Sequence, residues 1–379
     1  MASVGIIAEY NPFHNGHLYH LKKIKELYKD DTIVLVLSGN FTQRGEPSII
    51  DKWKKTEIAK KAGIDLIIEL PFVFATQSAD FFSYGAITIL EKLKVEKLVF
   101  GSESDNIEDL TTIAKTQLEN EDFDKLVKIY SKFGENYPTA ISKAIEDLTE
   151  KKVNAPNDLL GVSYIKTILK NNYKIKPVVI KRTNDYNSTD IEEISSATAI
   201  RKALKDNIDI EKAIPAYVTP YLQNLHYIDD YFQLLKYKII TEDNLSKYQT
   251  VDEGIEGKLK KEILNSTNYD DLINRVKSKR YTYNKISRML LHILIGLTKE
   301  DAKSMKEIEY IRILGFSNKG QAYLNSIKKD IDIEVLSKFK RNSSKMLELE
   351  LKTTTIYSLT ENNNTLIEEE YKNHLRKEI

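Results

Sequence analysis

The sequence predicts an α/β protein built on a doubly wound parallel sheet, followed by a mainly helical region. Apolar runs of strand length alternate with segments of helical spacing through about residue 180. This alternation is typical of parallel sheets with right-handed crossovers. Polar or glycine-containing turns follow several of the runs, and ligands on such sheets bind beyond the carboxyl ends of the strands. We therefore expect a ligand site at that edge.

Five apolar runs are the expected strands. They lie at residues 4–8, 32–38, 65–70, 97–100 and 176–180, with helical spacing at about 18–27, 52–62 and 79–94 between the first four. The second run is apolar almost throughout, as a strand covered on both faces should be. Residues 107–169 also have helical spacing, with breaks at Gly134 and Pro138. They predict a helical insertion at about 104–170.

The fold prediction divides the chain into two domains. Residues 1–205 would contain the sheet and its insertion, and residues 206–379 would form a mainly helical domain. Helical spacing dominates from about residue 208 to 327. Near the end, alternating leucines and glutamates at 347–351 and the threonine-rich residues 353–357 predict a short strand or an extended tail that packs back.

Composition excludes several classes of chemistry. The chain has 379 residues with 57 basic and 56 acidic side chains, so net charge does not indicate a partner. The absence of cysteine excludes disulfides, thiolate catalysis and Cys-based zinc sites. No acidic cluster has metal-ligand spacing, so we expect no metal held by the protein itself. No basic-then-apolar leader and no apolar run of membrane-spanning length is present, which favours a cytoplasmic protein without a membrane partner.

The turn after the first strand carries the strongest motif, Asn11-Pro12-Phe13-His14-Asn15-Gly16-His17. The residue before a proline avoids the helical region, which favours a turn at Asn11. Gly16 lets the backbone approach a ligand closely, and the amides that begin the next helix favour an anion. His14 and His17 can therefore face one phosphate from the same side. The alternative, that these histidines only cap the helix or lie on the surface, does not explain the combination.

A second motif, Ile194-Ser195-Ser196-Ala197-Thr198-Ala199-Ile200-Arg201, follows the fifth strand. Serines just before a helix are good N-caps. The serine hydroxyls, the helix amides and Arg201 would also form a second phosphate clamp that faces the first turn. Gly101 and Arg182, at the ends of the fourth and fifth strands, lie at the same predicted edge.

These motifs together resemble a known family. The segment 14–17 resembles the HxGH (HIGH-type) motif of the nucleotidyltransferase and class I aminoacyl-tRNA synthetase superfamily, and residues 6–17 resemble one branch, the bacterial tRNA(Met) cytidine acetate ligases. The segment 194–201 resembles the clamp that this superfamily carries where the synthetases have their lysine loop. Because no KMSKS-like loop is present, an ordinary aminoacyl-tRNA synthetase is not expected.

The resemblance implies a two-step reaction. Acetate attacks ATP to give acetyl-adenylate and pyrophosphate, and the N4 amine of the wobble cytidine of elongator tRNA(Met) then attacks the acetyl carbonyl. ATP is thus a substrate, and Mg²⁺ is expected to come with it. The implied catalytic residues are His14, His17, Ser196 and Arg201. The implied ATP-binding residues are Ile7, Ala8, Glu9, Tyr10, Asn11, Pro12, Phe13, His14, Asn15, Gly16, His17, His20, Gly101, Asn157, Arg182, Ser195 and Thr198.

For Asn157, the basic run at 275–288 and His292, the sequence allows both a functional and a purely structural interpretation. Asn157 is a nucleotide contact by resemblance, whereas its position favours an N-cap, by itself or by Asp158, for a helix at 159–169. A basic run at 275–288 suits tRNA phosphates and base stacking, with Lys279, Arg280, Tyr281 and Arg288 as the contacts. The alternative is a solvated helix face. His292 follows in an apolar run, which favours a core histidine.

Two other functions compete with the ligase. A small-molecule adenylyltransferase would use the same two motifs, but it would not need residues 206–379, which we expect to bind tRNA. A non-catalytic tRNA-binding protein would not need intact histidines and Arg201. The sequence indicates no protein partner.

Overall fold

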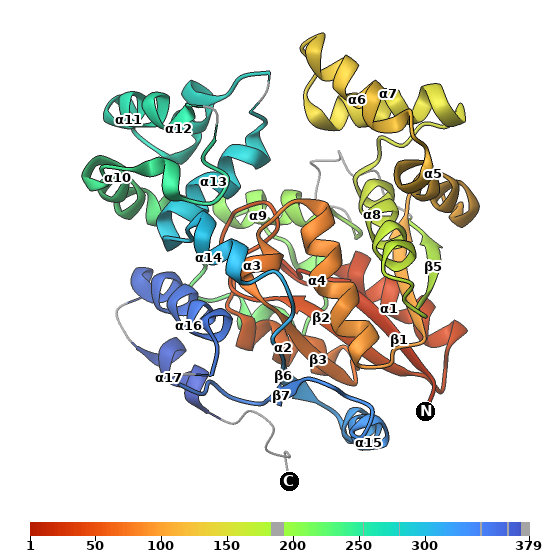
Figure 1. Cartoon of the computed structure of the whole chain (residues 1–379). Coiled ribbons are helices and arrows are strands. Elements are labelled where there is room, and N and C mark those ends of the chain that lie inside the picture. Colours follow the sequence, from red (N-terminus) through yellow and green to blue (C-terminus); the bar gives the residue numbers. More distant parts are fainter. Residues whose placement is uncertain (183–192, 253, 280, 342, 362–363, 373–379) are drawn as a thin grey trace.

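The core of the molecule is a mostly parallel sheet, shown in Figure 1. The structure is a computed structural model that describes residues 1–182, 193–252, 254–279, 281–341, 343–361 and 364–372. Within these residues, seven strands pair in the order β5-β4-β1-β2-β3-β6-β7, and all neighbours are parallel except β3 and β6. The strands are β1 (Ser3–Ala8), β2 (Thr32–Ser38), β3 (Leu66–Leu70), β4 (Lys97–Ser102), β5 (Lys176–Lys181), β6 (Tyr310–Phe316) and β7 (Glu334–Leu336). The doubly wound α/β prediction is confirmed.

The strand order reverses beside β1. The chain runs from β1 outward to β2 and β3, returns to pair β4 with the other side of β1, and continues to β5. Helices α1 (Asn15–Leu27) and α2 (Lys52–Lys61) make the outward connections, and α3 (Phe72–Ala75) and α4 (Ala79–Lys92) make the return. In Figure 1, α4 lies in front of the sheet and α1 behind it. The reversal places a ligand site beyond the carboxyl ends of β1 and β4.

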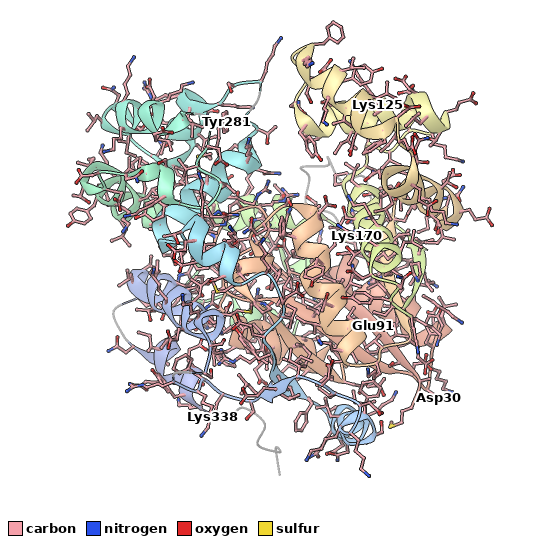
Figure 2. The ribbon with its side chains drawn as sticks, in the orientation of Figure 1. Asp30, Glu91, Lys125, Lys170, Tyr281 and Lys338 are labelled. Carbon is pink, nitrogen blue, oxygen red and sulfur yellow. The ribbon has the colours of Figure 1, made fainter. Side chains whose placement is uncertain are left out.

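The insertion between β4 and β5 is helical, as its spacing predicts. It contains α5 (Ile107–Glu119), α6 (Phe123–Lys132), α7 (Tyr137–Thr149) and α8 (Pro156–Lys170). Gly134 separates α6 from α7, but Pro138 is not a break. It lies in the first turn of α7, where the amide that proline lacks would have had no helical partner. The α6–α7 pair projects from the sheet, and Figure 2 shows Lys125 on it.

Helices α10 (Phe232–Thr241) to α14 (Lys299–Ser304) form a helical module, which lies on the opposite side of Figure 1 from the α6–α7 pair. It follows α9 (Ala197–Lys205) and also contains α11 (Ile255–Asn265), α12 (Tyr269–Val276) and α13 (Tyr283–Ile295). Figure 2 labels Tyr281 near the outer end of this module. The helices predicted from about residue 208 to 327 are present up to α14, are interrupted by strand β6, and resume with α15 (Asn318–Ile327).

The C-terminal part returns to the sheet and corrects two expectations. The strand β6 pairs antiparallel with β3 and lies within residues 208–327, where helical spacing predicts helices. Residues 347–351 and 353–357, expected as a short strand or an extended tail, instead lie in helix α16 (Lys345–Tyr357), which has Ser344 as its N-cap. The alternating leucines were misleading, because the buried positions Met346, Glu350, Thr353 and Tyr357 recur at helical spacing. The remaining helices are α15 (Asn318–Ile327) and α17 (Thr365–Tyr371).

A buried charge cluster explains why β6 was hard to recognise. Arg312 in the middle of β6 is fully buried, and its guanidinium pairs with Glu69 of β3 at 3.2 Å and with Glu370 of α17 at 2.6 Å. Lys52 of α2 pairs with the same two carboxylates, each at 2.6 Å. A central arginine argues against a buried strand unless its partners are known, and both partners are distant in sequence.

Candidate functional site

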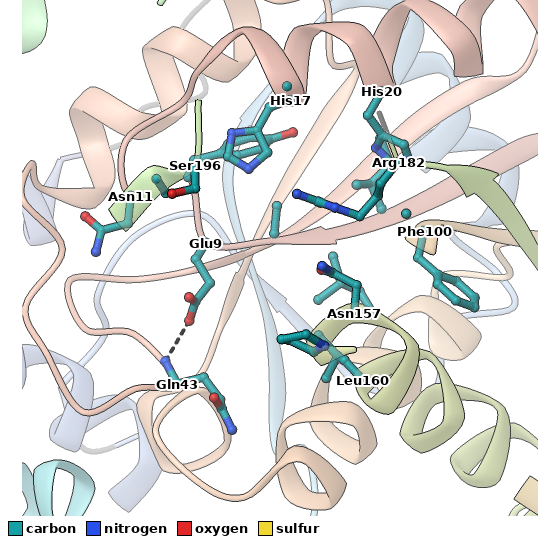
Figure 3. A pocket seen from close by; sticks show the side chains of 18 of the residues that line it. Glu9, Asn11, His17, His20, Gln43, Phe100, Asn157, Leu160, Arg182 and Ser196 are labelled. Atoms are coloured by element: carbon teal, nitrogen blue, oxygen red, sulfur yellow. Dashed lines mark hydrogen bonds between the residues drawn. The ribbon is translucent and has the colours of Figure 1, made fainter. Parts of the chain in front are cut away.

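A cavity of about 380 Å³ opens where the strand order reverses. It lies beyond the ends of β1, β4 and β5 and is bounded by the first turns of α1, α8 and α9 and by the loop after β2. Figure 3 shows its polar side chains facing one another across the space. Its lining includes Ile7, Ala8, Glu9, Tyr10, Asn11, His14, Gly16, His17, His20, Thr42, Gln43, Arg44, Phe100, Gly101, Asn157, Leu160, Tyr164, Arg182, Ser196, Thr198 and Arg201.

The two histidines of the first motif are oriented by the start of α1. His14 is the N-cap, and its Nδ1 accepts the backbone N–H of Gly16 at 3.0 Å. The Nδ1 of His17 accepts the backbone N–H of His14 at 3.3 Å, which closes a capping box. The ring centroids lie 3.8 Å apart. Because both Nδ1 atoms are acceptors, a neutral ring carries its proton on Nε2 and can donate it to a ligand.

Gly16 is required by this arrangement. A Cβ built there would lie 2.8 Å from Cε1 of His14, whose ring folds back over the turn. Gly16 lines the cavity, in agreement with the prediction that its backbone can approach a ligand, and the nearest side chain to it is this ring. Its absent side chain therefore allows His14 to act as the cap.

Burial keeps these histidines neutral. It lowers the pKa of His14 to about 3, with smaller contributions from Arg182 and Arg201. Burial also lowers the pKa of His17 well below its ordinary value, and the neighbouring His14 lowers it further. For His20, burial and Arg182 lower the pKa to about 4. At neutral pH the first turn thus presents uncharged N–H donors.

The second motif faces the first across the cavity. Ser196 is the N-cap of α9 and accepts the backbone N–H of Ala199 at 3.2 Å. One turn later, Arg201 donates to the carbonyl of Asn11 at 2.9 Å and to Oγ1 of Thr198 at 3.3 Å. Arg201 therefore links α9 to the turn that begins the first motif.

Two further groups come from the edge strands. Arg182, just after β5, points into the cavity between His17 and Asn157 in Figure 3. Asn157 donates to Oε1 of Glu103 at 2.5 Å, and Oε2 of Glu103 accepts the backbone N–H of Asp158 at 3.1 Å. Neither Asn157 nor Asp158 is the N-cap, which is Ala155. The cap prediction is wrong because Glu103, remote in sequence, bonds the first turn of α8.

Lys55 stabilises the edge beneath the cavity. Its fully buried ammonium donates to the carbonyls of Glu9, Ser38 and Gly39 at 3.0, 2.7 and 2.6 Å. Burial lowers the pKa of Lys55 to about 7, although Glu9 and other nearby carboxylates oppose the change. This lysine holds the ends of β1 and β2 together, and its role depends on contacts that no motif indicates.

Most residues expected to bind ATP line the cavity, and four do not. Phe13 and Pro12 are buried behind the turn. Asn15 donates to the carbonyls of Glu193 at 2.9 Å and Lys212 at 2.8 Å. Ser195 is 2% exposed and lies outside the lining. The lining also includes residues that the motifs missed, namely Thr42, Gln43, Arg44, Phe100, Leu160 and Tyr164. Thr42, Gln43 and Arg44 belong to the polar loop after β2, whose position at the carboxyl edge is the signal that could have singled them out.

The basic run does not form one surface. Lys279 is exposed, Tyr281 is 7% exposed and donates to the carbonyl of Asp252 at 2.6 Å, and Arg280 lies outside the described residues. Arg288 donates to the carbonyl of Gln43 at 3.3 Å, beside the cavity. The burial of Tyr281 argues against base stacking by this ring. His292 is a core residue, fully buried between Thr76 and Gln249.

The described residues add two observations about ligands and membranes. They contain no group of three or more His, Asp or Glu side chains placed to hold a metal ion. In the same residues, every helix is too short or too polar to cross a membrane.

Comparisons with known proteins agree with this geometry. The family described as HIGH nucleotidyl transferase matches residues 1–372. A tRNA(Met) cytidine acetate ligase from Caldicellulosiruptor saccharolyticus is 40% identical over 95% of this chain and 94% of its own. One from Clostridium acetobutylicum is 38% identical over 95% and 96%. The chain belongs to the tRNA(Met) cytidine acetate ligase family.

Solved structures show the same fold. Thermotoga maritima TmcAL without ligand is 31% identical, with a TM-score of 0.89 over 98% of this chain and 97% of its own. The same protein bound to alpha-thio ATP is 32% identical, with a TM-score of 0.86 over the same shares. The family expectation drawn from the two motifs is thereby confirmed.

Proposed function

We propose that this chain is an ATP-dependent ligase that acetylates the N4 amine of the wobble cytidine of elongator tRNA(Met). Acetate would attack the α-phosphate of ATP, forming acetyl-adenylate and releasing pyrophosphate, and the cytidine amine would then take the acetyl group. The observation that carries the proposal is the pair of neutral Nε2–H donors of His14 and His17, facing Arg201 across a cavity at the strand reversal. The family relationship supports the same reaction.

The first step needs positioning more than covalent help. A carboxylate is already a nucleophile, so no general base is required when acetate attacks. The α-phosphate gains charge in the transition state, and fixed donors stabilise that charge. His14, His17 and Arg201 supply such donors, and Ser196 presents the N-terminus of α9. Phe100, Leu160 and Tyr164 give the cavity an apolar side that suits a nucleobase.

Magnesium would enter with ATP. Among the described lining residues Glu9 is the sole carboxylate, which does not fit a magnesium ion held by the protein alone. Its expected ligands are mainly the phosphates and water.

The domain assignment extends the proposal. We assign ATP binding to residues 1–205 and tRNA binding to residues 206–379, in the cytoplasm where tRNA is modified. The two parts differ in proposed function but are not separate structural units, because β6 of the second part pairs with the sheet of the first. Exposed Lys277 and Lys279 at the end of α12 are the candidate phosphate contacts.

ATP–pyrophosphate exchange tests the function directly. Exchange that depends on acetate supports the ligase, and it should be followed by acetylation of tRNA(Met) transcript when tRNA is added. Exchange that depends on a phosphate ester would instead indicate a small-molecule adenylyltransferase. If no acid or ester supports exchange, the chain is a binding protein and the proposal is wrong.

A further inference from the structure

The second step of the proposed reaction leaves one proton without an acceptor. An amine that attacks an acyl carbonyl becomes positively charged at nitrogen and must lose a proton to give the amide. The histidines of the first motif are poorly placed to take it, because both Nδ1 atoms already accept backbone N–H groups. Their Nε2 atoms then carry protons and donate only. The cavity needs another acceptor.

Glu9 meets this need by position. It is the first residue after β1 ends, and it lines the same cavity as His14, His17 and Arg201. Its Oε1 accepts the backbone N–H of Gln43 at 2.6 Å, and its own carbonyl is held by Lys55 at 3.0 Å. Figure 3 shows the carboxylate directed toward Gln43 below His17 and Ser196. The hydrogen bond from Gln43 to Oε1 therefore holds the carboxylate in place.

The surroundings of Glu9 suit proton transfer. Burial raises the pKa of its carboxyl group, while the Gln43 amide and then Arg44, Lys55 and Arg201 limit the rise. Tyr164, buried on α8, is close enough that Glu9 contributes to the raised pKa of its hydroxyl. A carboxylate with a raised pKa is a stronger base, and a pKa closer to the working pH favours general-base catalysis.

We infer that Glu9 is the general base of acetyl transfer and binds the exocyclic amine of the cytosine. This inference rests on the proposed function. Carboxylates accept hydrogen bonds from cytosine N4. The N4 lone pair forms the bond to the acetyl carbon, the bond from that carbon to the adenylate oxygen breaks, and its electrons leave with AMP. The surplus proton on N4 passes to Glu9 and then to solvent, so acetylated amine, AMP and one proton are produced.

The test separates the two half-reactions in Glu9→Gln. The glutamine oxygen can still accept the Gln43 amide, so the local fold is retained. Acetate-dependent pyrophosphate exchange measures the first step, and single-turnover acetylation of tRNA(Met) transcript by enzyme loaded with labelled acetyl-adenylate measures the second. We expect transfer to slow by about 100-fold or more, a typical value for loss of a general base. Exchange should fall by less than about tenfold.

The pH dependence of transfer gives a second readout. In the wild type, transfer should slow as falling pH protonates Glu9, because a protonated carboxyl cannot accept the proton. This acidic limb should be missing in Glu9→Gln. A residue that only shaped the cavity would lower the rate at every pH and leave the limb in place.

Glu46→Gln is the matched control. Glu46 also lies near Arg201, at 3.9 Å, but is not part of the cavity lining. It should change exchange and transfer by the same factor. Equal losses in both steps for Glu9→Gln would overturn the inference, as would a selective loss of transfer in His20→Gln instead. If wild-type enzyme gives no acetate-dependent exchange, the proposed function fails before Glu9 is tested.

Discussion

The rings of His14 and His17 are oriented by backbone amides of the same turn. The backbone N–H of His14 donates to the ring of His17, and the ring of His14 accepts the backbone N–H of Gly16. The spacing of the motif therefore sets the orientation of both rings. The amide donors leave only the Nε2 positions for a ligand. Two uncharged donors at the start of a helix can approach a phosphate without the desolvation cost of burying cations there.

Replacing His17 tests this arrangement. We expect His17→Ala to slow acetate-dependent pyrophosphate exchange by about 100- to 1,000-fold, a typical loss for one donor to a developing charge. Binding of tRNA(Met), measured by filter retention, should be nearly unchanged, since we propose that residues 206–379 bind the RNA. Exchange at close to the wild-type rate would show that His17 is only a cap.

The second motif, residues 194–201, predicts which of two substitutions weakens ATP use more. Arg201→Ala should weaken ATP use more than Ser195→Ala, because the guanidinium offers a charged contact to phosphate and also holds the Asn11 carbonyl. Ser195 is buried outside the cavity lining. The ratio kcat/KM for ATP in the exchange assay measures both variants. A larger loss for Ser195→Ala would assign the serine a role in shaping the loop and remove this assignment for Arg201.

The loop after β2 joins the cavity to the helical module. Gln43 bonds Glu9 on one side and accepts from Arg288 of α13 on the other. Gly45 has φ +82°, and its carbonyl accepts the hydroxyl of Ser287 at 3.1 Å. A Cβ at Gly45 would lie 2.4 Å from the backbone nitrogen of Arg288. The loop and α13 therefore approach as closely as their backbones allow.

Gly45→Ala should reveal how much this contact contributes. We expect the free energy of unfolding, from urea denaturation, to fall by about 2 kcal/mol or more, since the strained φ and the backbone clash act together. Gly134→Ala is the control, because Gly134 has φ +90° and no atom within 4 Å of its built Cβ. Gly134→Ala should lower the free energy of unfolding by only about 1 kcal/mol, the cost of placing alanine in the left-handed region. Equal losses would mean that the loop moves away from α13 without cost.

The exposed lysines at the end of α12 lead to a prediction about RNA binding. The double variant Lys277→Ala/Lys279→Ala should weaken binding of tRNA(Met) transcript and lower the salt slope of log K by roughly 0.7 to 0.9 for each lost phosphate contact. Acetate-dependent exchange should be unchanged, because both lysines are exposed at the end of α12. Binding measured at several salt concentrations provides the test. An unaltered slope would mean that these residues only solvate the helix.

Elements with local signals were predictable from sequence, and elements that depend on distant partners were not. The first five strands are apolar runs, and the two motifs follow β1 and β5, so the fold and most of the motif residues that line the cavity could be predicted. The strand β6 carries a buried arginine whose partners are 243 residues before it, in Glu69, and 58 after it, in Glu370. The hydrogen bonds of Glu103 to α8 and of Lys55 beneath the cavity were not predicted, because their partners are also distant in sequence.

At the scale of the whole molecule, the C-terminal residues are part of the core. Glu370 of α17 pairs with Lys52 and Arg312, and Thr354 of α16 donates to it at 2.5 Å. Although burial raises the pKa of Glu370, Arg312 and Lys52 lower it to about 2. Glu350 lies in the same cluster, and burial and Glu69 raise its pKa to about 8. The last helix is thus fixed to the sheet by charges from both ends of the chain.

The buried histidines make the whole fold sensitive to acid. In the folded chain, burial lowers the pKa of His20, His226 and His292 to about 4 and that of His14 to about 3. In the unfolded chain each binds a proton near pH 6.5. The unfolded state therefore binds more protons between about pH 6.5 and 4, and stability must fall as pH falls through this window. Glu350 acts in the opposite sense, losing its contribution as pH rises toward 8.

His292→Gln isolates one of these contributions. Each histidine of this kind adds up to about 1.4 kcal/mol per pH unit to the slope of unfolding free energy against pH. His292 is fully buried, and glutamine can bond to Thr76 or Gln249 without titrating. The variant should be less stable at pH 7.5, yet its slope between pH 6 and 5, from urea denaturation, should be shallower by about 1 kcal/mol per unit. An identical slope would mean that His292 is already protonated in the fold, which its two carbonyl neighbours would then have to stabilise.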